Sequence, residues 1–316
     1  MQPHARAGYS FPLLLVLFAT GILFSCGNSH LLKELKQLDY PSASGTEYVQ
    51  GKIFIAGDDA ASLLVLDSSL EVVDSIPLYQ PAVKRMPKAT KPDLESITLT
   101  RDSQLLLIGS GSLAPYRNIA WLIDPLTYKK DSIRLDSFFQ RLPLNGIREI
   151  NIEGSCSIPG YFLLVNRGSK GYPKNQLIFA QGAFWKDQAG TPISTAFLGV
   201  NSDSNSFSGV SGMAYAAKSD RLLLTVSTED TRNNLDDGAI GKSYLWIVKN
   251  ISSKKRWKAI NPDEVIDLDA LDPRFKGQKI ESVCILADSG KFLHLLLVAD
   301  NDNGSSTLFK MVVCKD

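Results

Sequence analysis

Five positions along the chain carry oxygen-bearing side chains that could bind a cation. Each stands at the start of a similar phrase, in which small residues precede an apolar run and a polar tip, and successive positions lie 51, 58, 58 and 70 residues apart. Such self-similarity is typical of a repeat architecture. Oxygen ligands that converge on one axis suit a hard cation such as Ca²⁺. We call these positions the openers: Ser44, Glu95, Glu153, Ser211 and Glu281.

The chemistry of the openers favours a divalent cation over no ligand. Three carboxylates directed at one axis would repel one another and raise one another's pKa. A divalent cation would remove that cost, and carboxylate and hydroxyl oxygens suit Ca²⁺ better than Zn²⁺ or copper. The alternative is that the openers make hydrogen bonds to backbone groups of the strands and that no metal is held there. Both interpretations stay open from the sequence.

The openers need a scaffold that brings equivalent positions together, and the strand signals predict one. Each opener begins a set of about four short β-rich runs separated by Gly, Asp, Asn, Ser or Pro. The second set reads LESITLT, QLLLIGS, NIAWLID and DSIRLD. Runs of consecutive aliphatic residues fit strands that are buried on both faces. Four strands per repeat in a radial arrangement predict an all-β fold, the β-propeller, here with five four-stranded blades. The alternative is a six-bladed propeller.

The ring must also close. The last repeat supplies three strand signals before the sequence reaches Asp316, whereas the segment LLKELKQLDY (31–40) precedes the first opener and has no repeat of its own. We therefore expect this N-terminal segment to pair as the outermost strand of the last blade. Its apolar residues also have helical spacing, so a short helix is the alternative.

The N-terminal residues have the pattern of a secretory signal. Arg6 precedes the apolar core FPLLLVLFATGILFS, and Cys26 follows at a position that fits a bacterial lipobox. The sequence thus predicts a signal peptide at 1–25, a lipidated tether at 26–35 with the lipid on Cys26, and the propeller at 36–316. The membrane would then be a partner, and the protein would lie in the cell envelope. Gly27, which is not an Asp, favours the outer membrane.

Composition excludes several other classes of function. The chain has 34 basic and 33 acidic residues without a basic arm, so nucleic acid is not an expected partner. Only three histidines occur, at positions 4, 30 and 294. One is in the signal, one in the tether, and His294 lies inside the apolar run FLHLLLV. Neither a Ser-His-Asp triad nor a histidine-based zinc site is therefore expected.

The repeats resemble the calcium-activated nucleotidase (apyrase) family, which are five-bladed propellers. The resemblance covers patches between Ser44 and Leu286. Its segments are SGTEYVQGKIFIAGDD, LESITLTRDSQLLLIGS, GVSGMAYAAKSDRLLLTVSTED with SYLWIV, and KIESVCI. In that family a central Ca²⁺ is held by side chains in the order Ser, Glu, Glu, Ser, Glu. The five openers have the same order, so the resemblance implies a Ca²⁺ site at the openers.

The family's catalytic tips match only in part. Asp58 and Asp59 remain from the first-blade tip, where Ala60 replaces an Arg. The third-blade tip keeps one Arg of two, Arg167, and Ser227 replaces a Lys on the fourth blade. Fewer cations weaken the case for phosphoryl transfer from a nucleotide, because that chemistry needs positive groups around the developing charge. The candidate catalytic residues are Asp58, Asp59 and Arg167, and the candidate substrate-binding residues are Arg117, Asn166 and Glu229.

Two functions follow from these features. The first is a calcium-dependent hydrolase of phosphate or other esters, in which an Asp orients water and Arg167 holds substrate charge. The second is a non-catalytic binding or scaffold propeller with structural calcium, whose partner is a protein. The sequence does not decide between them, and it names no substrate.

Overall fold

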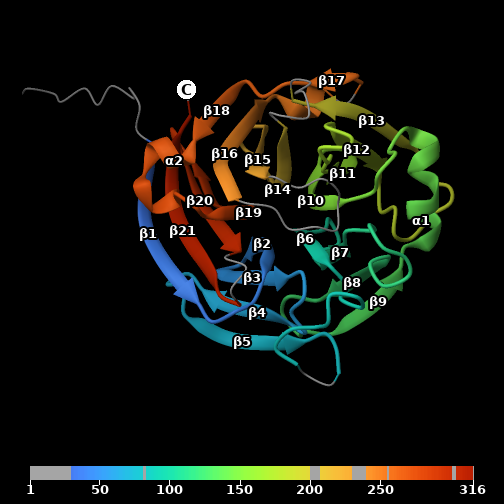
Figure 1. Ribbon diagram of the computed structural model, residues 1–316, viewed down its shortest axis with the longest axis horizontal. Coiled ribbons are helices and arrows are strands. Elements are labelled where there is room, and N and C mark those ends of the chain that lie inside the picture. Colours follow the sequence, from blue (N-terminus) through green and yellow to red (C-terminus); the bar gives the residue numbers. More distant parts are fainter. Residues whose placement is uncertain are drawn as a thin grey trace, which may run out of the picture.

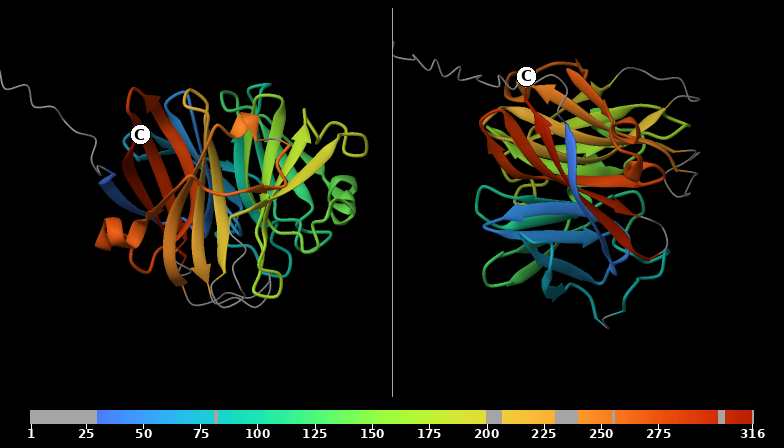
Figure 2. Two further views of the ribbon diagram at one scale, coloured as in Figure 1. Left: turned by 90° about the horizontal axis from the view of Figure 1, so that it is seen from above. Right: turned by 90° about the vertical axis from the view of Figure 1, so that its left-hand side faces the viewer.

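The computed structural model describes residues 30–80, 83–199, 207–229, 240–254, 256–300 and 304–315. These residues form five antiparallel sheets around one axis (Figure 1), and the two side views show the sheets stacked face to face around the ring (Figure 2). The predicted five-bladed β-propeller is confirmed, and the six-bladed alternative is wrong. The signal peptide 1–25, Cys26 and the tether residues 27–29 lie outside the described residues.

The blades follow one another in chain order, and within each the innermost strand comes first. Blade 1 holds β2 (Ala43–Val49), β3 (Lys52–Gly57), β4 (Ser62–Asp67) and β5 (Val72–Pro77). Blade 2 holds β6 (Leu94–Leu99), β7 (Leu105–Gly109), β8 (Ile119–Ile123) and β9 (Lys130–Arg134). Blade 3 holds β10 (Ile152–Ile158), β11 (Tyr161–Asn166), β12 (Asn175–Gln181) and β13 (Ile193–Leu198).

The last two blades are less regular. Blade 4 holds β14 (Ser208–Ala216), β15 (Arg221–Glu229), β16 (Ile240–Lys249) and β18 (Glu264–Asp267). Before β18, the short β17 (Ala259–Ile260) pairs in parallel with β13 and so adds a fifth strand to blade 3. Blade 5 holds β19 (Lys279–Ser289), β20 (Phe292–Asp300) and β21 (Ser306–Cys314), and its outermost strand comes from the other end of the chain.

That outermost strand is β1 (Leu31–Leu38), which pairs antiparallel with β21 from Leu31 opposite Val312 to Leu38 opposite Ser306. In Figure 1 the blue β1 lies beside the red β21. The predicted closing strand is confirmed and the helical alternative is wrong. Residues 31–35, which fall inside the expected tether, are thus part of the blade. The helical spacing of the leucines is overridden because β21 offers an open edge for main-chain hydrogen bonds.

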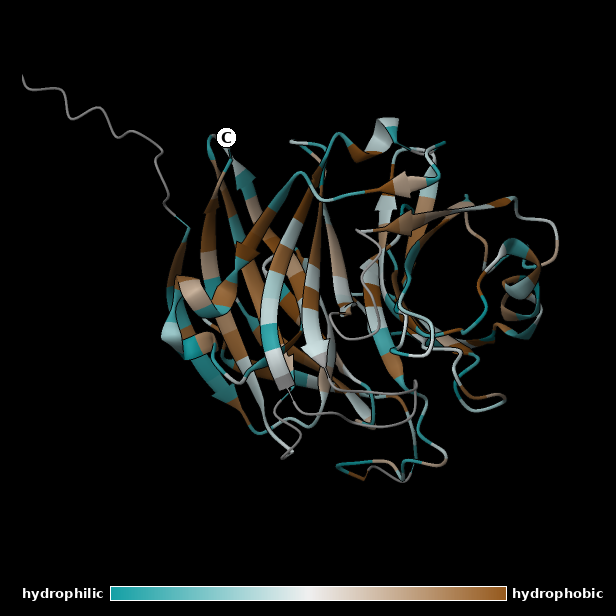
Figure 3. Ribbon diagram, turned by 45° about the horizontal axis from the view of Figure 1, so that its top comes forward, coloured by the Kyte–Doolittle hydropathy of each residue, from teal (hydrophilic) through white to brown (hydrophobic). Residues whose placement is uncertain are grey.

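The core lies between the blades. Leu105, Leu106, Leu107 and Ile108 of β7 are all buried, because each face of the sheet is covered by a neighbouring blade. Figure 3 shows the hydrophobic residues along the strands. Helices are short: α1 (Asp136–Arg141) and α2 (Leu268–Leu271) join blades at the periphery, with 3-10 turns at Pro143–Asn145, Ile251–Ser253 and Pro273–Phe275. No helix in the described ranges has the length and apolar character needed to cross a membrane.

The closing strand generates a test. Leu38 is buried between blades 5 and 1, in one cluster with Ile53 and Leu308, whereas Leu35 on the same strand is 37% exposed. We expect Leu38→Ala to lower the free energy of unfolding by about 2–4 kcal/mol, because a buried leucine leaves a cavity when truncated. Leu35→Ala is the matched control and should cost less than about 1 kcal/mol. Equal losses in urea denaturation would contradict the closure by β1.

Candidate cation site at the openers

Every opener forms a β-bulge in its inner strand. The pairing of the inner strand with the second strand skips one residue in all five blades, between Ala43 and Gly45 in blade 1 and at the equivalent place in the others. A bulge leaves one residue out of the ladder and re-aims its side chain. The five openers are therefore structurally equivalent, as their spacing predicted.

The two serines donate to the backbone of the next blade. Ser44 Oγ donates to Leu94 O, the residue before the second opener, and Ser211 Oγ donates to Ile280 O at 2.6 Å, the residue before the fifth. Both serines are buried. A hydroxyl has one proton and two lone pairs, so each oxygen keeps acceptor capacity after this bond. The serines tie blade 1 to blade 2 and blade 4 to blade 5.

Glu153 and Glu281 are buried carboxylates, each beside a cation. Asn151 Nδ2 donates to Glu153 Oε1 at 2.6 Å, and an Arg167 guanidinium nitrogen lies 3.7 Å from the same oxygen. Lys279 Nζ lies 2.8 Å from Glu281 Oε1, while Glu281 Oε2 is buried and has no hydrogen-bond partner among the described residues. Burial raises the pKa of Glu153 to about 8; Arg167 opposes this rise, and the charge of Glu281 adds to it.

Glu95 is the third carboxylate and belongs to a wider acidic cluster. Burial, followed by the charges of Glu153 and Asp93, holds its pKa well above the usual range. One carboxylate oxygen of Glu95 lies within 4.8 Å of one each from Asp58 and Asp93. Glu153 thus lies near enough to Glu95 and to Glu281 for electrostatic repulsion, although the three carboxylates come from three blades.

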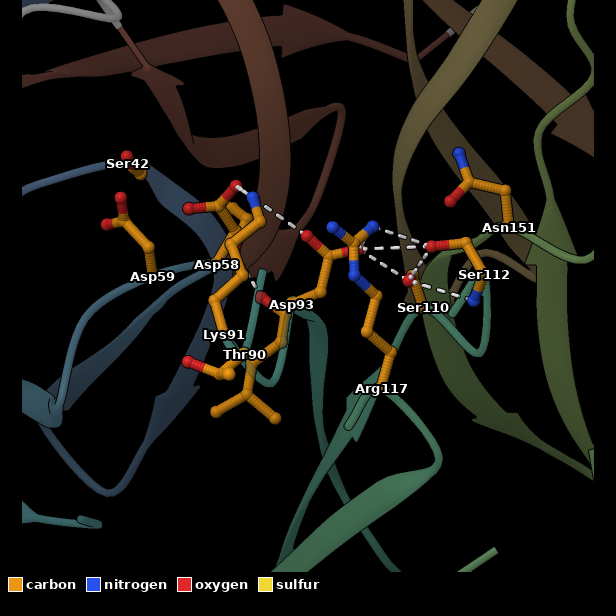
Figure 4. A network of polar contacts seen from close by, with 12 residues as sticks. Ser42, Asp58, Asp59, Thr90, Lys91, Asp93, Ser110, Ser112, Arg117 and Asn151 are labelled. Carbon is orange, nitrogen blue, oxygen red and sulfur yellow. Dashed lines mark hydrogen bonds and ion pairs between the residues drawn. The ribbon is translucent and has the colours of Figure 1, made fainter. Parts of the chain in front are cut away.

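Asp58 and Asp93, the two acidic neighbours of Glu95, belong to a network of ion pairs (Figure 4). The Lys91 ammonium contacts Asp58 and, at 2.8 Å, Asp93 Oδ1. Arg117 approaches the other oxygen of Asp93 at 2.7 Å, and Ser110 Oγ also donates to that oxygen. In the figure Lys91 points from its loop toward both aspartates. Asp58 and Asp93 are thus each paired with a cation.

The candidate catalytic residues lie at the same end of the ring. In every blade the start of the inner strand pairs with the end of the second strand, as in Ala43 with Gly57 and Ile152 with Asn166, so the tips after the second strands surround the openers. Asp58 and Asp59 follow β3, and Arg167 follows β11. Asp59 Oδ2 accepts from Arg85 Nε at 2.7 Å. Burial raises the pKa of Asp58 to about 6, although Lys91 opposes the shift.

The candidate substrate-binding residues are differently placed. Arg117 is buried in its ion pair with Asp93. The amide of Asn166 donates to the carbonyl oxygens of Glu149 (2.9 Å) and Arg167 (3.2 Å) and accepts from Asn151 N, so it holds the third-blade tip in shape. Glu229 ends β15, and its side chain lies outside the described part. A role of these three residues in substrate binding stays a prediction.

The sequence reasoning missed the position two residues before each opener. Asp93, Asn151 and Lys279 occupy it in blades 2, 3 and 5. Asn151 and Lys279 contact their openers, and Asp93 lies beside Glu95 and pairs with Lys91. Residues i and i−2 of a strand share a face, so a second row of polar side chains follows from the strand period. The sequence contained this signal, because four of the five openers have a polar residue two positions before them. In blade 1 that residue is Ser42.

The other end of the inner strands opens into an axial cavity of about 590 Å³, lined by residues of all five strands. Its wall includes the position three residues after each opener: Glu47, Thr98, Cys156, Ala214 and Cys284. Burial raises the pKa of both thiols, which makes them poor nucleophiles. Glu47 accepts from the backbone of Leu99 and Tyr48, and burial raises its pKa to about 7.

Comparison with known proteins places the chain in a family. A family model described as "Family of unknown function (DUF6929)" matches residues 39–313. The chain belongs to this family. No curated protein has a matching sequence.

Two solved structures illustrate the likeness. Myxococcus xanthus glutaminyl cyclase is 11% identical with a TM-score of 0.54, over 91% of this chain and 97% of that one. Selenomethionine-substituted virginiamycin B lyase from Staphylococcus aureus is 11% identical with a TM-score of 0.40, over 88% and 99%. At these identities the first likeness shows the propeller fold alone.

The raised pKa of Glu153 generates a test of the electrostatics. Folding raises the pKa of the Glu153 carboxyl from its ordinary 4.5 to about 8. Between these two pH values the folded protein keeps a proton that the unfolded chain releases. The free energy of unfolding in EDTA should therefore decrease as pH rises through this window. Glu153→Gln removes one of the carboxyl groups that titrate in this window, so it should reduce the slope of the profile, measured by urea denaturation from about pH 5 to about pH 8, while Glu47, Asp58 and Glu95 keep the remaining slope. Glu71→Gln, whose side chain is 70% exposed, should keep the parent profile. A slope in Glu153→Gln equal to that of the parent would show that the pKa of Glu153 is not raised by folding.

Proposed function

We propose that this protein is a calcium-binding propeller of the cell envelope, with Ca²⁺ held at the openers by Glu95, Glu153 and Glu281. The observation that carries the proposal is the convergence of three mutually repelling carboxylates from three blades. Glu281 Oε2 adds a buried acceptor without a hydrogen-bond partner among the described residues. A divalent cation would satisfy that oxygen and remove the repulsion.

The donor set supports calcium over other metals. All candidate ligands are oxygens, and the described part of the site has no thiolate or imidazole. Ser44 and Ser211 give their protons to backbone carbonyls, so their lone pairs stay available to a cation. Ca²⁺ accepts six to eight oxygens with flexible geometry, which leaves room for water. It would compete with Lys279 for Glu281 and with Arg167 for Glu153.

Isothermal titration calorimetry tests this proposal directly. The mature protein from residue 27 onward is freed of metal with EDTA, dialysed and titrated with CaCl₂. We expect one saturable site, and about 2.7 kcal/mol of added stability at a hundredfold excess over the dissociation constant. Glu153→Gln and Glu281→Gln should each weaken binding at least about tenfold, because each removes a charged ligand. Glu71→Gln is the control. Absence of binding, or equal affinity in all three variants, would refute the calcium site.

We extend the proposal to ester hydrolysis at the same end of the ring. Asp58, whose pKa lies near 6, is suited to orient or deprotonate water close to neutral pH. Ca²⁺ at Glu153 would release Arg167 from that carboxylate, and its guanidinium could then hold an anionic group of the substrate. Phosphate esters and carboxylate esters are the substrate classes that this arrangement would take.

A non-catalytic binding propeller is the second candidate, and one observation favours it. Arg117 and Asn166, two residues expected to bind substrate, are occupied by Asp93 and by backbone groups. Turnover of p-nitrophenyl phosphate and p-nitrophenyl acetate with CaCl₂ separates the candidates. A hydrolase should lose at least about a hundredfold in rate on Asp58→Asn, because general base catalysis contributes that much. No turnover by the parent protein, together with intact calcium binding, would establish the binding protein instead.

We propose further that the protein is lipid-anchored through Cys26, in the outer membrane. The support is the apolar segment and the lipobox-like position of Cys26 in the sequence. Mass spectrometry of the N-terminal peptide from membranes should show a diacylglyceryl thioether on Cys26. An unmodified thiol or a disulfide at this residue would refute the anchor.

A further inference from the structure

A second cavity, of about 300 Å³, lies between blades 3 and 4. Its wall includes Asn175 and Ser208, which begin β12 and β14, and Leu198, which ends β13. The cavity therefore opens at the same end of the ring as the openers but away from the axis. It has the size of a small-molecule site, since such sites begin at about 300 Å³. Nothing in the calcium proposal uses it.

Four aromatic side chains line this cavity: Phe197, Phe207, Tyr244 and Trp246. Phe207 is buried, whereas Phe197 is 38% exposed. Gly199 has a positive φ of 81° and packs against the indole, because a Cβ there would lie 2.7 Å from Trp246 Cζ3. The backbone is thus shaped around the ring of Trp246. The equivalent Trp121 of blade 2 instead donates to Tyr79 Oη at 2.9 Å and packs edge-on against that ring.

The cavity also holds polar groups that the described structure leaves unused. Lys174 Nζ lies 5.0 Å from the centroid of the Phe197 ring and has no carboxylate partner among the described residues. Within the same residues, neither the Tyr244 hydroxyl nor the Trp246 N–H makes a hydrogen bond. The nearby acids are already paired, Asp263 with Lys254 and Glu264 with His30.

Asn175, by contrast, forms the wall. Its amide donates to Ser208 O at 2.8 Å and accepts from Gly168 N and Val210 N, so it fixes the joint between blades 3 and 4. The polar groups with free capacity are therefore the ammonium, the phenol and the indole N–H. An ammonium beside aromatic faces attracts an anion whose remaining body is apolar and planar.

We infer that this cavity binds a small anionic aromatic molecule. The rings of Phe197, Tyr244 and Trp246 pack against the planar body of the ligand, and Lys174 pairs with its carboxylate or sulfonate. Tyr244 and Trp246 donate the remaining hydrogen bonds. The cation selects this class over a neutral sugar, which would use the aromatic faces and accept hydrogen bonds from Lys174 but would form no ion pair with it.

Two fluorescent dyes of nearly equal shape test the inference. 8-Anilinonaphthalene-1-sulfonate carries the anion, and N-phenyl-1-naphthylamine lacks it. We expect the folded protein to bind the sulfonate at one site. Lys174→Met should weaken binding of the sulfonate about three- to fivefold, the effect expected from losing a partly exposed ion pair. Binding of the neutral dye should not change. Val265 lies on the rim and is 53% exposed, so Val265→Glu places a negative charge beside the cavity and should weaken binding of the sulfonate by a similar factor.

Lys129→Met, an exposed lysine of blade 2, is the matched control and should bind both dyes like the parent. Thermal melts of every variant show that the fold is kept. The inference would be overturned by no sulfonate binding by the parent, by equal binding by the parent and both cavity variants, or by displacement of the neutral dye by maltose but not by phenylacetate. Equal loss of both dyes in Lys174→Met would show that charge plays no part.

Discussion

The repulsion between buried carboxylates on the ring axis is the constraint on which the site depends. Five inner strands converge, so side chains at one equivalent position of each blade come close to the axis. Three of these side chains are glutamates; Glu153 and Glu281 are buried, and Glu95 is half-buried. The cations at this end, Lys91, Arg167 and Lys279, are oriented by that charge, since each lies beside one of the glutamates or its acidic neighbour. Any ligand of this site must fit the same charge balance.

Because of the bulges, the openers can contact a neighbouring blade as well as contribute to the cation site. A residue outside the ladder is free to reach the adjacent blade, and Ser44 and Ser211 use this freedom to bind the backbone before the next opener. Further along the inner strands, Ser282 Oγ accepts from Thr46 N and joins blade 5 to blade 1. Ring closure therefore rests on polar contacts near the axis and on β1 at the periphery.

The opener site and the aromatic cavity differ in chemistry because they differ in place. Near the axis only the inner strands contribute, and these carry small and polar residues that fit the narrow space. Between blades 3 and 4 the outer strands diverge, which leaves room for large rings such as Phe197 and Trp246. The axial site accordingly suits a cation, and the peripheral one suits a planar organic molecule. Trp246 and Trp121 occupy equivalent strands and still end in unlike surroundings.

The sequence by itself determined the fold and its register: the spacing of the openers predicted five blades, and the unmatched segment 31–40 predicted the closing strand. It did so because strand alternation and repeats are local properties of the chain. Only the tertiary structure decided the pairings, such as Lys91 with Asp58 and Asp93, or Arg117 with Asp93. Those contacts join loops whose side-chain directions no spacing specifies. The aromatic cavity likewise exists only once blades 3 and 4 are packed together.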